Sequence, residues 1–267
     1  MKSKKTLLRL MLYFLLIPIF ILCFFYFLQE KLIFIETRSE KTNLSYFNEV
    51  KDISFNENGV HFEGYIINAD QAHNGLVFYY GGNAEDVVSS IIDYIMIKDR
   101  ALIFFNYRGY GKSTGKPSQE SLFNDADLIL KKCINQYEVD DITLIGRSLG
   151  SGVACYLASE NKVSRLILVT PYDSILKVAG GHYPFLPVSL LLKHPFRSDI
   201  YIQKVNVPIL VFIAGRDRVI PNERSEALLK HMKVKPQVVF LEKSDHNNVT
   251  QPPEFRKTIK DFFVSND

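Results

Sequence analysis

Seven short apolar runs place the strongest limit on how this chain can fold. They are residues 60–67, 75–80, 101–107, 141–145, 164–170, 208–214 and 237–241. Several are apolar at almost every position, which is typical of parallel strands that are covered on both faces. Stretches with helical periodicity follow them, at residues 85–98, 119–136, 149–160, 222–233 and 253–264. This alternation predicts an α/β fold, in which a mostly parallel sheet carries helices on both faces.

A different kind of apolar run lies near the N-terminus. Residues 10–28, LMLYFLLIPIFILCFFYFL, contain no charge and include Pro18, which a membrane span tolerates. As a helix they would be about 28 Å long, close to the thickness of a bilayer's hydrocarbon core. A cleaved signal peptide is the alternative, but the run is long for one and LQEKLIFIE after it has no A-x-A cleavage site. We therefore expect a retained transmembrane helix.

Charge around this run predicts its orientation. Four cations and no acid precede it, namely Lys2, Lys4, Lys5 and Arg9, which places the tail in the cytoplasm and the main domain across the membrane. In a bacterium that compartment is the periplasm. The rest of the chain has 28 basic against 29 acidic residues, so its balance does not indicate nucleic-acid binding. The expected segments are a tail (1–9), a span (10–28), a connector (29–50) and an α/β domain (51–267).

One interval interrupts the alternation of strands and helices. Residues 171–206 separate two expected strands by far more than a usual connection and are rich in proline and aromatic residues. Such an insertion is either a cap that binds substrate or a pair of short helices packed on the sheet. Its candidates for an apolar substrate pocket, which are equally candidates for core, are Tyr172, Tyr183, Phe185, Leu186 and Leu190.

The pattern G-x-S-x-G, which surrounds the nucleophilic serine of many hydrolases, occurs twice, at residues 111–115 and 146–150. A nucleophilic serine of this kind needs a strand before the motif and a helix after it. The second copy has both, because DITLI precedes GRSLG and SGVACYLASE follows, so Ser148 is the candidate nucleophile. In the first copy the strand ends about six residues before Ser113 and TGKPSQE opposes a helix. That copy also fails as a phosphate-binding loop, which would need glycine at Asn106.

A serine nucleophile needs a base, and the base needs an acid that orients it. Of the six histidines, only His246 follows a last apolar strand, in FLEKSDHNNV. The acid should lie between serine and histidine in the chain, where a strand ends. Asp217, in AGRDRVIP, meets both conditions, and Asp173, one strand earlier, is the alternative. No spacing of cysteine and histidine suggests a metal site.

Five segments together resemble the α/β-hydrolase superfamily, and specifically its membrane-anchored single-domain serine hydrolase branch. They are LIGRSLGSG, AGRDRVIP, SDHNN, YYGGNAED and NYRGYGKSTGKPS, and the resemblance covers about residues 51–267. It implies an α/β-hydrolase fold with a short cap and a triad of Ser148, Asp217 and His246. It also implies an oxyanion hole formed by the backbone N–H groups of Leu149 and Asn83.

The activity expected from this resemblance is that of a membrane-tethered serine hydrolase. It would cleave an ester or thioester of a small or lipid-like acyl substrate through an acyl-enzyme, with no metal or organic cofactor. A peptidase of the same fold and a non-catalytic membrane-tethered scaffold are the alternatives.

Overall fold

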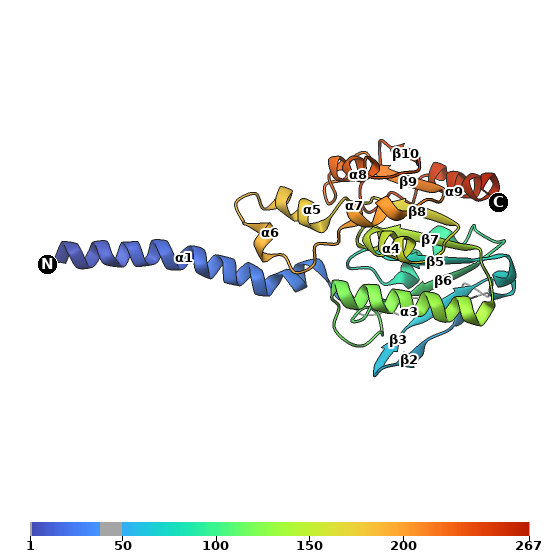
Figure 1. Cartoon of the computed structure of the whole chain (residues 1–267), viewed down its shortest axis with the longest axis horizontal. Helices are drawn as coiled ribbons and strands as arrows, with labels where there is room; N and C mark the ends of the chain where they lie inside the picture. Colours follow the sequence, from blue (N-terminus) through green and yellow to red (C-terminus); the bar gives the residue numbers. More distant parts are fainter. Residues whose placement is uncertain (1, 38–49, 267) are drawn as a thin grey trace.

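The computed structural model describes residues 2–37 and 50–266. Its N-terminal helix, α1 (Lys2–Ile33), projects from a compact body that holds the remaining elements (Figure 1). A window of 18 residues in α1, Leu16–Ile33, has a mean hydropathy of 1.8 and is 6% buried, so α1 is long and apolar enough to cross a membrane. Pro18 lies within the helix without ending it.

The body is built on an eight-stranded sheet with the order β1-β4-β6-β5-β7-β8-β9-β10. The strands are β1 (Val50–Asp52), β4 (Gly64–Ile67), β5 (Leu76–Tyr80), β6 (Ala101–Phe105), β7 (Ile142–Arg147), β8 (Arg165–Val169), β9 (Ile209–Ala214) and β10 (Gln237–Leu241). Pairing is antiparallel from β1 to β4 and from β4 to β6, and parallel across the other strands. A separate hairpin joins β2 (Phe55–Glu57) to β3 (Val60–Phe62). This is the α/β-hydrolase fold that the sequence predicts.

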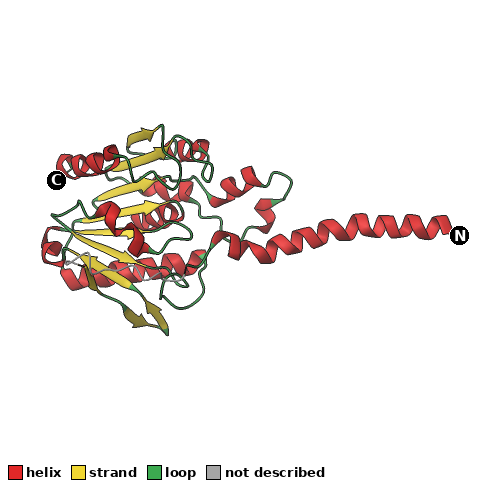
Figure 2. Cartoon of the chain, turned by 180° about the vertical axis from the view of Figure 1, so that it is seen from behind, coloured by secondary structure: helices red, strands yellow, loops and turns green. Residues whose placement is uncertain are grey.

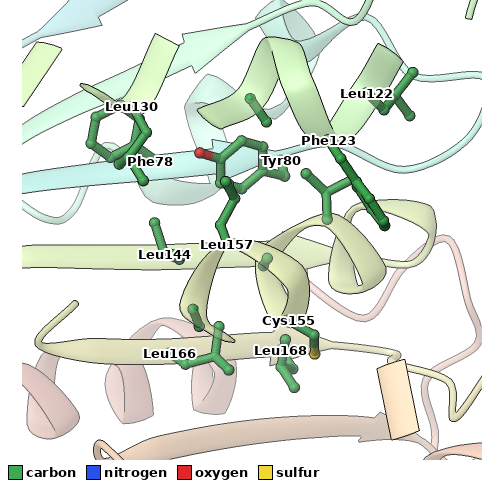
Figure 3. Packing of buried hydrophobic residues seen from close by; sticks show 14 of the residues in the cluster. Phe78, Tyr80, Leu122, Phe123, Leu130, Leu144, Cys155, Leu157, Leu166 and Leu168 are labelled. Carbon is green, nitrogen blue, oxygen red and sulfur yellow. The ribbon is translucent and has the colours of Figure 1, made fainter. Parts of the chain in front are cut away.

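Helices cover both faces of the sheet (Figure 2). On one face, α3 (Gln119–Tyr137) and α4 (Leu149–Glu160) pack against alternate residues of the central strands, such as Phe78 and Leu144 (Figure 3). On the other face, the intervening residues pack against α2 (Ile91–Tyr94) and α9 (Pro253–Ser265). Because both faces are buried, the strands need apolar residues at every position, which explains their continuous apolar runs.

The structure differs from two of the predicted elements. The run 60–67 is divided at Glu63, whose buried carboxylate binds polar groups, and the chain there leaves the hairpin for the sheet. The predicted helix 85–98 is only a 3-10 turn, η3 (Val87–Ser90), followed by α2. Hydroxyl groups at the start of that segment bond to Asp86 and Glu85, which competes with helix formation. The short polar strands β1 and β2 were not predicted at all.

The interval 171–206 contains several short helices. They are α5 (Ile175–His182), α6 (Val188–Leu191), α7 (Ser198–Tyr201) and the 3-10 turn η4 (Ile202–Lys204). The first two lie beside the C-terminal part of α1, at the edge of the body from which α1 projects (Figure 1). The last two pack on α4. The remaining helix, α8 (Asn222–Leu229), follows β9.

Candidate active site

Ser148 occupies the sharp turn between β7 and α4. Its backbone has φ 49° and ψ −118°, a strained conformation for a residue with a side chain. The turn is possible because the strand and the helix approach closely on both sides of it. A Cβ at Gly150 would lie 2.1 Å from the Tyr80 carbonyl oxygen, and one at Gly146 would lie 2.5 Å from that of Gly150. The two glycines of the motif are therefore required by contact with backbone.

Ser148, His246 and Asp217 come together in a continuous chain of hydrogen bonds. His246 Nε2 lies 2.9 Å from Ser148 Oγ, and His246 Nδ1 lies 2.7 Å from Asp217 Oδ2. The other oxygen of Asp217 accepts the backbone N–H groups of Val219 and Ile220, both at 2.8 Å. An ionised carboxylate only accepts, so the proton of a neutral His246 lies on Nδ1 and Nε2 is free to accept from serine.

Asp173, the alternative acid, lies in a different environment. One of its oxygens accepts the Ser174 N–H at 2.9 Å, and the other pairs with Arg224 at 3.2 Å. Burial raises the pKa of its carboxyl group, and the N–H and the guanidinium oppose that shift. Asp217, and not Asp173, is the carboxylate that contacts His246.

The loop after β5 carries Asn83, the second residue implied for an oxyanion hole. Its side-chain oxygen accepts three hydrogen bonds, from the N–H of Ile35 at 2.8 Å, the N–H of Ala84 at 3.0 Å and the hydroxyl of Tyr110 at 2.9 Å. In the part of the chain that the structure describes, the backbone N–H groups of Asn83 and Leu149 have no hydrogen-bond acceptor. Both residues border the same hollow as Ser148.

Two charged residues near the site were missed in the sequence reasoning. Glu85 accepts from the Gly82 N–H at 2.7 Å and the Tyr79 hydroxyl at 2.6 Å, which holds the turn before Asn83. Arg147 pairs with Glu85 at 3.4 Å and donates to the His246 carbonyl at 3.3 Å. Their positions within GGNAED and GRSLG were a signal, since both segments flank reacting groups.

Two hollows of different character meet at Ser148. The polar hollow, of about 240 Å³, is bordered by Glu85, Asp86, Arg147 and His246, with the backbone of the Asn83 loop. The apolar hollow, of about 400 Å³, is bordered mainly by Leu32, Ile33, Tyr172, Ala179, Tyr183 and Ile220. A substrate bound at Ser148 can therefore place an apolar group in one hollow and a polar group in the other.

The five residues predicted for the substrate pocket separate into two groups. Tyr172 and Tyr183 border the apolar hollow, and Leu186 borders a smaller hollow next to it. The prediction is wrong for Phe185 and Leu190, which are 98% and 83% exposed. The physical reason is local: Phe185 lies in the turn between α5 and α6, and Leu190 lies on an exposed face of the short helix α6.

Ser113, in the first G-x-S-x-G copy, has a structural role. It is buried, accepts the Glu63 N–H at 2.9 Å and donates to the Asn106 carbonyl at 3.0 Å. Burial alone would raise the pKa of the Glu63 carboxyl, but hydrogen bonds from Tyr65, the Lys112 N–H and other donors lower it below its usual value. This loop braces the sheet edge and presents no free hydroxyl.

Metal-ligating clusters and reactive thiols are two other kinds of group that bear on the chemistry. No group of three or more metal-ligating side chains occurs among residues 2–37 and 50–266. Cys133 and Cys155 are buried free thiols, and burial raises the pKa of Cys133 to about 12. These thiols lie in the core beneath α3 and α4 and are far from ionisation at neutral pH.

Comparison with known proteins agrees with this fold. A family model described as the alpha/beta hydrolase fold matches residues 76–187. An uncharacterized protein of Mycobacterium tuberculosis is 34% identical over 150 residues, which are 55% of this chain and 53% of that protein. The human alpha/beta hydrolase domain-containing protein 17C is 29% identical over 192 residues, 70% of this chain and 57% of that one. The chain thus spans about half the length of the curated relatives it matches.

Among solved structures, the Pyrococcus furiosus esterase Pf2001 superposes with a TM-score of 0.70 at 19% identity, over 86% of this chain and 96% of the esterase. The enol-lactonase from Burkholderia xenovorans LB400 gives a TM-score of 0.62 at 12% identity, over 79% of this chain and 99% of that one. At these identities the structures show a shared fold. The family model, the relatives and the solved structures agree with the α/β-hydrolase fold of this chain.

Proposed function

We propose that this protein is a hydrolase, and specifically a membrane-anchored serine esterase or thioesterase that works through an acyl-enzyme. The observation that carries the proposal is the hydrogen-bonded series Ser148, His246 and Asp217, with the serine at the junction of an apolar and a polar hollow. In this series the serine contacts the histidine and the histidine contacts the aspartate, which is the arrangement of nucleophile, base and acid that acyl transfer needs.

In the first half of the reaction, Ser148 Oγ attacks the carbonyl carbon of the substrate while its proton passes to His246 Nε2. The imidazolium that forms is stabilised by Asp217, which accepts its Nδ1–H. The imidazolium then gives the Nε2 proton to the leaving oxygen or sulfur as the bond to the carbonyl carbon breaks. An acyl group remains on Ser148. Water repeats the sequence, with His246 taking its proton, and the acid leaves.

The negative charge that develops on the carbonyl oxygen needs donors that are already in place. We assign this role to the backbone N–H groups of Asn83 and Leu149, which have no acceptor within the described residues. The Asn83 side chain is fixed by three donors, so the loop does not have to rearrange during the reaction. Leu149 is the first residue of α4, where the helix dipole adds to the attraction.

We favour an ester or thioester over a peptide because of the division between the two hollows. The apolar hollow suits an acyl chain, and the polar hollow suits the alcohol or thiol part of the substrate. A peptidase would require a group that binds a peptide amine, and Glu85, a carboxylate that borders the polar hollow, is occupied by Arg147, Tyr79 and the Gly82 N–H.

The N-terminal helix supports the anchoring part of the proposal. Its window Leu16–Ile33 has a mean hydropathy of 1.8, and the basic residues before it favour a cytoplasmic N-terminus and a catalytic domain on the opposite side. Cysteine substitution at Ser3 and at Lys243, each labelled in intact cells with an impermeant maleimide, tests that topology. Labelling at position 3 alone would contradict it.

A fluorophosphonate probe, which forms a covalent bond with an activated serine, tests the catalytic assignment. We expect the wild type and Ser113→Ala to be labelled and Ser148→Ala to remain unlabelled. Labelling of Ser148→Ala at the wild-type rate would refute the assignment. A panel of short-chain esters, thioesters and aminopeptides then identifies the bond, and faster cleavage of the peptides would refute the esterase proposal.

A further inference from the structure

The C-terminal turns of α1 are part of the site. Leu32 and Ile33, which end the apolar helix, border the apolar hollow together with Ser148. An anchor that only tethered the domain would need no such contact. Here the helix that would emerge from the bilayer supplies one wall of the space into which the serine opens.

A second hollow, of about 80 Å³, lies between α1 and the helices α5 and α6. This hollow is bordered by Phe25, which precedes Leu32 and Ile33 in α1, and by Leu186. Leu32, Ile33, Ala179 and Tyr183 border both this anchor-side hollow and the apolar hollow. The two spaces therefore adjoin, and together they extend from Ser148 along α1 as far as Phe25.

Contacts between α1 and the following segments hold this arrangement. The side-chain amide of Gln29, only 7% exposed, donates to the Leu191 carbonyl at 2.9 Å and accepts the Lys193 N–H at 2.7 Å. The amino group of Lys193 also pairs with Glu30 at 3.1 Å. Phe25 and Tyr183 place their rings 5.7 Å apart across the anchor-side hollow. The helix is thus fixed to the cap by specific polar and aromatic contacts.

The anchor-side hollow is lined mainly by apolar side chains, and other apolar side chains of α1, α6 and the α5–α6 turn are exposed. Phe185, in the turn between α5 and α6, and Leu190, in α6, are 98% and 83% exposed. On another face of α1, Phe24 and Phe27 border a separate hollow and are 52% and 74% exposed. An apolar surface that continues along an apolar helix in this way is suited to acyl chains of a bilayer and not to water.

The geometry points to a long acyl chain of a bilayer component as the group that this site takes. The chain lies along the passage between α1 and the α5–α6 pair, defined by Leu32, Ile33, Ala179 and Tyr183, and the ester or thioester carbonyl reaches Ser148 while the polar part occupies the polar hollow. This inference rests on the proposed acyl-transfer function and adds that the anchor helix is a wall of the substrate site.

The test narrows the passage in the full-length protein reconstituted in phosphatidylcholine vesicles. Ala179→Phe puts a ring at a residue that borders both hollows. We expect kcat/KM for a p-nitrophenyl hexadecanoate to fall at least tenfold more than kcat/KM for the butanoate. Leu32→Trp narrows the same place from the α1 side and gives a second measurement if Ala179→Phe does not fold.

Gly181→Phe is the matched control. It adds the same ring to α5 at an exposed glycine whose Cβ would have no neighbour within 4 Å, so both esters should react as with the wild type. An equal change for the two esters in Ala179→Phe and in Leu32→Trp would overturn the inference. Wild-type protein that neither binds fluorophosphonate nor cleaves butanoate would instead overturn the proposed function itself.

The source of the chain is tested with a fluorogenic hexadecanoyl lipid. It is placed either in the vesicles that hold the enzyme or in separate vesicles of the same composition. We expect hydrolysis at least tenfold faster in the shared vesicles. Equal rates would overturn delivery from the enzyme's own bilayer.

Discussion

Replacing Asp217 by asparagine isolates the contribution of one negative charge. The oxygen that accepts the N–H groups of Val219 and Ile220 would stay in place, because an amide oxygen accepts equally well at 2.8 Å. The amide nitrogen would then face His246 Nδ1, where the carboxylate oxygen now lies at 2.7 Å. A donor at that position requires Nδ1 to be an acceptor. The imidazole proton would move to Nε2, which could no longer accept from Ser148.

The expected loss follows from this change of tautomer. Substitutions of this kind in serine hydrolases lower kcat by about 10⁴, which corresponds to about 5 kcal/mol at 1.36 kcal/mol per tenfold. Stability should change little, by about 1 kcal/mol or less, because both backbone hydrogen bonds remain. The assay is kcat on a butanoyl ester together with thermal unfolding, and Asp173→Asn serves as the control that keeps activity.

Two outcomes would refute this reasoning. Asp217→Asn with more than a tenth of the wild-type kcat would show that the charge is not needed for the reaction. A larger loss in Asp173→Asn than in Asp217→Asn would show that the wrong strand end has been identified as the source of the acid.

Three further substitutions probe the surroundings of the site. Gly150→Ala puts a Cβ 2.1 Å from the Tyr80 carbonyl oxygen and should lower the free energy of unfolding by about 1–3 kcal/mol or more in a denaturant titration. Ser113→Ala removes a buried hydroxyl with two partners and should cost about 1–3 kcal/mol while fluorophosphonate labelling persists. Glu63→Gln should destabilise at pH 7 by about 1–3 kcal/mol, and its difference from the wild type should shrink in acid.

The sign of the pH effect comes from the lowered pKa of Glu63. Its stabilising contribution is complete above the usual carboxyl value of 4.5 and is lost as the pH falls through the lower value in the folded protein. A difference that stayed constant from pH 7 to pH 3 would contradict this assignment. A Gly150→Ala variant as stable as the wild type would contradict the close contact at Gly150. Loss of fluorophosphonate labelling in Ser113→Ala would contradict the structural role of Ser113.

The central part of the fold was predictable because its signals are local. Continuous apolar runs such as β7 and β8 indicate strands that are covered on both faces. The motif GRSLG begins in the last two residues of β7, so the strand and the motif could be recognised together. The chain order of Ser148, Asp217 and His246 was readable for the same reason, since each residue follows a strand end.

What escaped prediction depends on contacts between distant segments. The direction of Phe185 is set by a turn, and apolar character in a cap is equally compatible with pocket, core or membrane surface. The role of Gln29 depends on Leu191 and Lys193, more than 160 residues away in sequence. Glu85 likewise acts through Arg147 from another strand. Periodicity and motif spacing carry no information about such pairs.

The hydrogen bond from the Ile35 N–H to the Asn83 side chain, at 2.8 Å, links the end of α1 to the loop beside the serine. A transmembrane helix changes its tilt when the bilayer becomes thinner or thicker than its apolar length. With its end joined to Asn83, tilting of α1 would displace the loop whose N–H we assign to the oxyanion hole. The rate of acyl transfer would then depend on membrane thickness. Rates measured in vesicles made from lipids of different chain length would reveal this dependence. A rate independent of lipid length would show that tilting of α1 is not transmitted to the Asn83 loop through this hydrogen bond.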